Sequence, residues 1–132
     1  MNTKIESENL TAIFSPLAGA SLRSLVVSKS SEKYDVISNR EKRIDPSFLP
    51  LGSGSFIMAP WVNRIKSGIL NTDKGITELP IDVHFNDHLN AIHGTVWNQE
   101  WKIDFHEKEQ FQYSVELKDP WPFNGRIVMK AV

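Results

Sequence analysis

The stretch Phe111-Gln112-Tyr113-Ser114-Val115-Glu116-Leu117 decides the fold, because large apolar residues alternate with polar ones along its whole length. A period of two is typical of a β-strand that buries one face. The same period recurs in residues 10–14 and in Trp101-Lys102-Ile103-Asp104-Phe105-His106, and the polar residues 107–110 predict a hairpin between two of the strands. These patterns predict an all-β fold of half-buried antiparallel strands.

Other parts of the chain extend this interpretation. Ala18-Gly19-Ala20 predicts a turn before an apolar strand over residues 22–27, and residues 126–132 predict a last strand. No window carries a helical stripe, and seven Gly and seven Pro suit short strands joined by turns. Because the last strand ends without a turn or cap, we expect one partial domain over residues 1–132, the N-terminal part of a longer protein.

Composition excludes several classes of function. The chain has 132 residues, a net charge of −1 and no cysteine, so it offers neither an electrostatic footprint for nucleic acid nor a disulfide framework. The basic stretch Arg40-Glu41-Lys42-Arg43 contains an acid and predicts a solvated loop. Residues 1–9 lack an apolar core and no apolar run could span a membrane, so we expect no secretory signal, no membrane partner and a cytoplasmic location.

Residues 39–55 form the longest polar, loop-like region, and Gly52-Ser53-Gly54-Ser55 lies at its end. This glycine-rich run lacks the Gly-Lys-Ser/Thr that completes a phosphate loop, and no helix is predicted after it. A flexible connection is the better prediction.

Two short segments carry the candidate chemistry. Met58-Ala59-Pro60-Trp61-Val62-Asn63-Arg64-Ile65 and Ala91-Ile92-His93-Gly94 place a carboxamide, a guanidinium, an imidazole and an aromatic ring on irregular stretches between apolar strands. A small neutral ligand rich in hydroxyls, such as a sugar, needs donors and acceptors at fixed positions and an apolar surface for its C–H faces. We therefore predict that Asn63, Arg64 and His93 bind a sugar. The alternatives are a surface or salt-bridging arginine and a buried histidine satisfied by a backbone carbonyl.

A metal site is a weaker hypothesis. His84, His88 and His93 lie close in sequence, with Asp82 and Asp87 among them. A His-x-x-x-His pair faces one way only on a helix, and residues 85–90 are typical of a turn. We predict no metal.

The remaining tryptophans suit structural roles. Trp97 and Trp101 would share one face of a strand, and core packing is the favoured role for both. Trp121 lies in Asp119-Pro120-Trp121-Pro122-Phe123, a rigid aromatic turn that either stacks on a sugar or closes a strand end, and the second is favoured.

The chain resembles the aldose 1-epimerase (galactose mutarotase) family over nearly its full length. The matching pieces, in family order and at family-like spacing, are Gly19-Ala20-Ser21-Leu22-Arg23-Ser24-Leu25, residues 54–65 with Gly68, Ala91-Ile92-His93-Gly94 with Trp101, and Asp119-Pro120-Trp121-Pro122-Phe123. The resemblance implies an antiparallel β-sandwich of the galactose-mutarotase-like (supersandwich) type, incomplete here, with a concave sugar-binding face.

The resemblance also implies a reaction in carbohydrate metabolism, the interconversion of the α and β anomers of a free hexose such as glucose or galactose. A carboxylate takes the proton of the anomeric hydroxyl and an acidic imidazole protonates the ring oxygen, with no metal or organic cofactor. The family's substrate-binding roles map onto Asn63, Arg64 and His93. Its general acid histidine and general base glutamate match no residue here and are expected beyond Val132.

Two other functions stay open: a non-catalytic carbohydrate-binding β-sandwich domain, and a phosphosugar (hexose-6-phosphate) 1-epimerase of the same family. The sequence does not fix the oligomeric state. If half a sandwich lacks its facing sheet, Phe111, Tyr113 and Val115 would be left exposed, each forgoing roughly 1.5–3 kcal/mol of burial.

Overall fold

The computed structural model describes residues 2–37 and 55–132. Within these residues the chain forms strands and short 3-10 turns and no α-helix. In chain order the elements are β1 (Thr3–Glu6), β2 (Leu10–Ser15), η1 (Pro16–Ala18), β3 (Ser21–Lys29), β4 (Glu32–Asp35), β5 (Arg64–Lys66), β6 (Ile69–Thr72), β7 (Gly75–Glu78), η4 (Val83–Phe85), β8 (Asn90–Ile92), β9 (Lys102–His106), β10 (Phe111–Glu116) and β11 (Arg126–Ala131). The predicted all-β class is confirmed.

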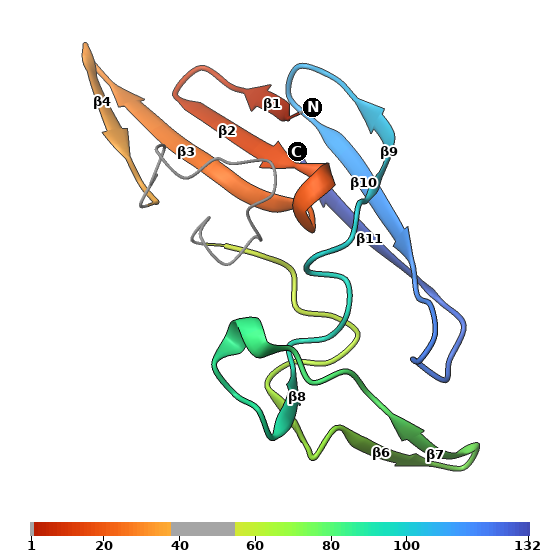
Figure 1. Ribbon diagram of the computed structural model, residues 1–132. Coiled ribbons are helices and arrows are strands. Elements are labelled where there is room, and N and C mark those ends of the chain that lie inside the picture. The colour runs from red at the N-terminus through yellow and green to blue at the C-terminus, as the bar shows by residue number, and fades with distance from the viewer. Residues whose placement is uncertain (1, 38–54) are drawn as a thin grey trace.

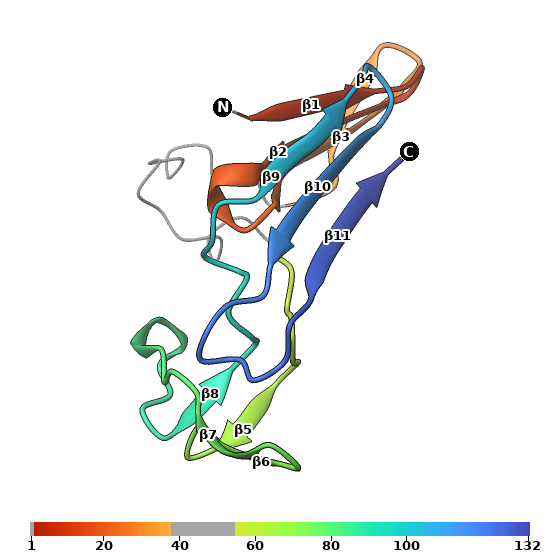
Figure 2. The same cartoon turned by 90° about the vertical axis from the view of Figure 1, so that its right-hand side faces the viewer.

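The strands form two larger sheets and two short ladders, all antiparallel. The larger sheets have the orders β1-β2-β3-β4 and β11-β10-β9, and the ladders are β5-β8 and β6-β7. Figure 1 shows the two larger sheets beside each other at one end of the molecule and β6, β7 and β8 at the other. Turned by 90°, β9 and β10 pass in front of β2 and β3, so the two sheets form two layers (Figure 2).

The core lies between these layers and follows the alternation in the sequence. The rings of Phe14 on β2 and Phe111 on β10 lie 4.7 Å apart, so the sheets meet through aromatic side chains. The buried members of this core come from both sheets, from the turn before β3 and from the segment before β9, and are Ile5, Ala12, Phe14, Ala20, Val96, Trp101, Phe111, Tyr113 and Val115.

The inner face of β10 is covered, and the expectation that it would be left exposed is wrong. Phe111 and Tyr113 are 0% exposed and Val115 is 6% exposed. The physical reason is that the β1–β4 sheet supplies the facing layer within this chain. On β9 the alternation predicted burial less well. Ile103 is 44% exposed, and the pairing of β9 with β10 has a register shift between Gln112 and Tyr113.

Backbone hydrogen bonds join the turn between β2 and β3 to the segment that leads into β9. The N–H of Trp101 donates to the carbonyl of Pro16 at 2.8 Å, and the N–H of Gly19 donates to the carbonyl of Gln99 at 2.9 Å. Gly19 has φ +64°, and a Cβ there would lie 1.8 Å from the Trp97 carbonyl oxygen, so a side chain cannot be accommodated. Trp97 and Trp101 are each 1% exposed, which confirms core packing, although both precede the strand.

Some predictions fall on residues that the structure does not describe. These are the basic loop Arg40-Glu41-Lys42-Arg43, the first three residues of Gly52-Ser53-Gly54-Ser55 and nearly all of the polar region 39–55. In the described ranges no helix is long and apolar enough to cross a membrane.

Candidate functional site

The two candidate segments, about thirty residues apart in sequence, are held side by side by main-chain pairing. β5 pairs with β8 so that Arg64 lies opposite Ile92. The N–H of His93 donates to the carbonyl of Asn63 at 3.1 Å, which continues the ladder past its end. Ala59 forms a parallel bridge with Gly94. Figure 2 shows β5 and β8 alongside each other. The backbone therefore fixes the relative positions of all three predicted sugar-binding residues.

The site contains unusual backbone geometry. Asn63 has φ +64° and His93 has φ +61°, both in the left-handed region. Asparagine and histidine enter this region more often than most residues, but each still costs of order 1 kcal/mol there. Gly94 follows with φ +79°, and a Cβ on it would lie 1.8 Å from the carbonyl oxygen of Ala59. Such conformations gather at functional sites, where the surrounding structure enforces them.

His93 receives a hydrogen bond that sets its tautomer. The backbone N–H of Asn63 donates to Nδ1 of His93 at 3.1 Å. A backbone amide is always a donor, so Nδ1 carries no proton and the neutral ring must carry its proton on Nε2. Burial, and then the nearby positive charge of Arg64, lower the pKa of His93 below its ordinary value. His93 is thus a neutral imidazole with one N–H donor left for a ligand.

Aromatic rings surround His93 and account for its partial burial. The Phe85 ring lies 5.2 Å from the imidazole and the Phe56 ring 6.0 Å away, both roughly edge to face. Phe85 also meets Trp97 at 4.9 Å. η4, which carries Phe85, therefore packs against both His93 and the end of the core.

Arg64 is fixed at two of its nitrogens. Its Nε donates to Oδ2 of Asp87 at 2.7 Å, and its Nη1 donates to Oδ1 of Asn63 at 3.2 Å. The Arg64 side chain is still 56% exposed, so part of the guanidinium faces solvent. Asn63 therefore contacts both other predicted residues, with its main chain toward His93 and its side chain toward Arg64.

Asp87 is a residue of the site that the sequence did not assign to it. Its Oδ1 accepts hydrogen bonds from the N–H groups of Leu89 and Asn90 at 2.9 and 3.0 Å, and the Asn90 side-chain amide contacts both carboxylate oxygens. The Asn90 amide, then Arg64, then the Leu89 N–H hold the pKa of Asp87 well below its usual range. The available signal was the turn-rich stretch 85–90, where an aspartate commonly binds the backbone two residues on.

The indole of Trp61 is partly covered by another aromatic side chain, so less of it is available to a ligand than its place beside Asn63 and Arg64 suggested. Its indole stacks on Trp121 with ring centres 5.6 Å apart and planes 23° apart, and Phe123 meets Trp121 edge to face at 5.7 Å. Lys74 reaches this cluster from the β6–β7 turn, donating to the carbonyl of Pro122 at 3.3 Å. The aromatic turn 119–123 therefore packs on the segment that carries the site.

The histidines considered as metal ligands bind different partners. His84 contacts Asp82 at 2.5 Å through Nδ1, whereas His93 is bound to Asn63. Among residues 2–37 and 55–132, no three His, Asp or Glu side chains are grouped so as to hold a metal ion.

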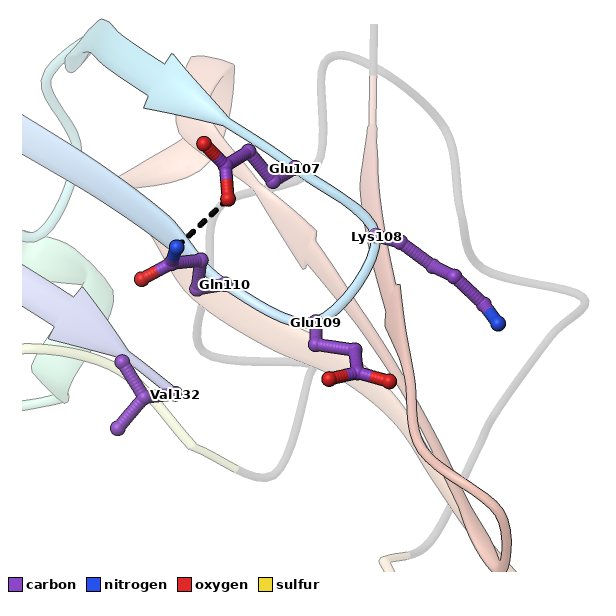
Figure 3. Close-up of a pocket in the computed structure, with 5 residues that line it drawn as sticks. All are labelled: Glu107, Lys108, Glu109, Gln110 and Val132. Carbon is purple, nitrogen blue, oxygen red and sulfur yellow. Dashed lines mark hydrogen bonds between the residues drawn. The ribbon is translucent and has the colours of Figure 1, made fainter.

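A separate hollow of about 360 Å³ lies at the β9–β10 hairpin, lined by Glu107, Lys108, Glu109, Gln110 and Val132 (Figure 3). One hydrogen bond crosses it, from Nε2 of Gln110 to Oε2 of Glu107 at 2.6 Å. The hairpin is at the opposite end of the molecule from β8 (Figure 1), so this hollow is distinct from the candidate site.

Comparisons with known proteins identify the fold. No protein-family model matches the chain, and no curated protein matches it. Solved structures do match. A putative aldose 1-epimerase from Escherichia coli K12 superposes with a TM-score of 0.75 at 14% identity, over 98% of this chain and 40% of that one. A GalM/aldose epimerase homologue from C. elegans gives 0.70 at 21% identity, over 98% and 41%.

A galactose mutarotase related enzyme from Lactobacillus acidophilus gives a TM-score of 0.69 at 17% identity, over 98% of this chain and 38% of that one. The chain therefore spans about two fifths of the length of these proteins. At such identities the likeness concerns the fold alone. The fold of this chain is that of part of a galactose-mutarotase-like β-sandwich, in agreement with the resemblance read from its motifs.

Proposed function

We propose that this chain supplies the sugar-binding part of an aldose 1-epimerase acting on a free hexose such as glucose or galactose. The observation that carries the proposal is the mutual contact of the three candidate residues. Asn63 binds His93 through its main chain and Arg64 through its side chain, so a carboxamide, a guanidinium and a neutral imidazole share one site. The fold shared with aldose 1-epimerase-like structures supports it.

The chemistry of the site suits sugar hydroxyls. A hexose offers several O–H groups and a ring oxygen, each of which can accept a hydrogen bond. The Nε2–H of neutral His93 and the solvent-facing N–H groups of Arg64 are donors, and the phenyl rings beside His93 provide apolar surface for sugar C–H groups. In this proposal the three residues bind and orient the sugar, and proton transfer to and from it belongs to other groups.

A free hexose is favoured over a phosphosugar because Asp87 compensates the charge of Arg64. A non-catalytic sugar-binding domain would use the same three residues, and it differs only in lacking the acid and base. We further propose a role in carbohydrate metabolism, and a cytoplasmic location stays a prediction.

Sugar titration tests the proposal. Binding of glucose and galactose to the chain, followed by saturation-transfer NMR or tryptophan fluorescence, is expected to weaken at least tenfold in Arg64→Ala and in His93→Ala, because each loses hydrogen bonds to the ligand. His88→Ala is the matched control, since His88 is an exposed histidine of the same loop, and its affinity is expected to stay unchanged. Equal affinity in all four proteins would remove the assignment.

A further inference from the structure

Sugar binding alone does not account for the low exposure of Asp87 or for the number of hydrogen bonds that it accepts. Its side chain is only 13% exposed, although the arginine that it binds is 56% exposed. Five hydrogen bonds converge on its two oxygens, of which Oδ1 takes the turn amides and Oδ2 takes Nε of Arg64 at 2.7 Å. The carboxylate is thus anchored by its own turn in addition to its bond with the guanidinium of Arg64.

The way in which Arg64 is held determines which of its donors remain. Nε is bound to Asp87 and one Nη1 proton is directed to Asn63, and the described residues supply no partner for Nη2. Because the guanidinium is planar and rigid, fixing Nε and Nη1 also fixes the direction of the Nη2 protons. A ligand oxygen therefore meets a preset donor edge, which lowers the ordering cost of binding.

Asp87 also sets the charge of the site. Arg64 and Asp87 together carry no net charge. Lys66 is the other cation on β5, and alternate residues of a strand share a face, so Lys66 lies on the same side as Arg64. Without the Asp87 carboxylate, two uncompensated cations would flank the site and attract a phosphate dianion.

We propose that Asp87 is a positioning residue that orients Arg64 through Nε and cancels its charge, and thereby makes the site select an uncharged hexose over a phosphorylated one. This selectivity rests on the proposed function, because it requires that the site bind sugars. The positioning of Arg64 by Asp87 does not require it.

Asp87→Asn removes the charge while keeping an oxygen for the two turn amides. Dissociation constants for glucose and glucose 6-phosphate are measured in both proteins. The preference for glucose is expected to fall roughly 2- to 5-fold in the variant, the range set by one partly exposed ion pair. Asp73→Asn makes the same charge change in the β6–β7 turn and is the control, with an unchanged preference expected. In an Arg64→Ala background the effect of Asp87→Asn is expected to be smaller, because only the direct charge of Asp87 and not its hold on Arg64 is then lost, and an effect of the same size would overturn the positioning of Arg64.

A second readout does not depend on any sugar. The positive charge of Arg64 lowers the pKa of His93, and Asp87 offsets part of that charge. An NMR titration of His93 is therefore expected to show a lower pKa in Asp87→Asn than in the parent chain. If Asp87→Asn does not fold, Asp87→Ser, which keeps a turn acceptor, replaces it in both experiments.

The outcomes separate the two claims. Sugar binding with an unchanged preference in Asp87→Asn would overturn the selectivity and leave the proposed function standing. Absence of any sugar binding by the parent chain would overturn both the selectivity and the proposed function. An unchanged pKa of His93 in the variant would overturn the offset of the Arg64 charge by Asp87, and so would a raised pKa, because it would mean that Arg64 moves away from His93 once Asp87 no longer holds it.

Discussion

The backbone N–H of Asn63 donates to Nδ1 of His93 at 3.1 Å, and the N–H of His93 donates back to the carbonyl of Asn63 at the same distance. The two residues thus bind each other twice, and both adopt positive φ. One consequence concerns protonation. A proton on Nδ1 of His93 would face the Asn63 N–H, so the imidazolium cannot form without breaking this bond.

The folded chain is expected to lose stability in acid. The pKa of His93 is lowered in the folded chain, so the unfolded chain takes up the proton first as the pH falls below about 6.5, the ordinary histidine value. The unfolded state then binds more protons than the folded state, and stability falls with falling pH. His93 therefore contributes stability that is complete above about pH 6.5 and is lost as the pH falls through the lowered pKa.

Equilibrium unfolding in urea between pH 8 and pH 5 checks this, with a His93→Asn variant as the control. Asparagine tolerates the positive φ at this position and does not titrate, so its stability is expected to depend less on pH over the same interval. A parent chain and variant with the same pH dependence would contradict the prediction.

Gly94 is expected to tolerate no side chain. In Gly94→Ala the new Cβ would lie 1.8 Å from the carbonyl oxygen of Ala59, whose bonds to Thr95 and Val96 hold it in place, and φ is +79°. We expect a loss of more than about 3 kcal/mol of unfolding free energy, or no folded protein.

Gly75→Ala is the matched control for Gly94→Ala. Gly75 also has positive φ, but a Cβ there meets nothing within 4 Å, so only backbone strain of about 1–3 kcal/mol is expected. Thermal unfolding of the two variants separates the clash from the strain. Equal shifts in midpoint would mean that the approach of Gly94 to Ala59 contributes nothing.

The stack of Trp61 on Trp121 is expected to have a spectroscopic signature. Two indoles 5.6 Å apart couple their electronic transitions, so the chain should show an exciton couplet in circular dichroism. Trp121→Ala is expected to abolish the couplet and to lower the unfolding free energy by about 1–3 kcal/mol, because Trp121 is only partly buried. Trp121→Phe should lose the couplet with a smaller loss of stability. A couplet that survives in both variants would place the coupling elsewhere.

Local pattern was sufficient to predict five of the strands in the described residues, β2, β3, β9, β10 and β11, and it missed the six that are only three or four residues long. Alternation located β2 and β10, and the polar run before Phe111 located the hairpin whose Glu107 N–H donates to the Gln110 carbonyl at 2.8 Å. Burial on one face is a property of each strand by itself, so it can be read from consecutive residues. Asn63, Arg64 and His93 were chosen for their chemistry, and the structure brings them into contact.

Pairings between distant residues could not be predicted in this way. Which layer covers Phe111 depends on how β1–β4 packs, and a period of two does not encode that. The Arg64–Asp87 pair joins residues 23 positions apart, and Asp87 looked like an ordinary turn residue. Trp61 and Trp121 meet through the folding of two loops that have no regular period. Tertiary contacts of this kind decide which donors of a site stay free.

The 132-residue chain is expected to bind sugar without accelerating mutarotation. The carboxylate beside the described site, Asp87, is bound by Arg64 and Asn90, and its pKa is held well below the usual range, which makes it a poor base. His93 has a lowered pKa and is equally unsuited to act as the acid at neutral pH. Each absent acid or base costs typically ~10²–10⁴ in rate.

Polarimetry on freshly dissolved α-glucose and α-galactose measures this directly, with buffer alone as the reference rate. We expect the chain to leave the rate at that reference while the same preparation shows sugar binding by NMR. Enzyme-like acceleration that disappears in Asp87→Asn would make Asp87 a base, contradicting its role as the partner of Arg64. Acceleration that persists in Asp87→Asn and is lost in His93→Ala would instead move proton transfer to the imidazole, and the division between binding and chemistry proposed for this site would be wrong.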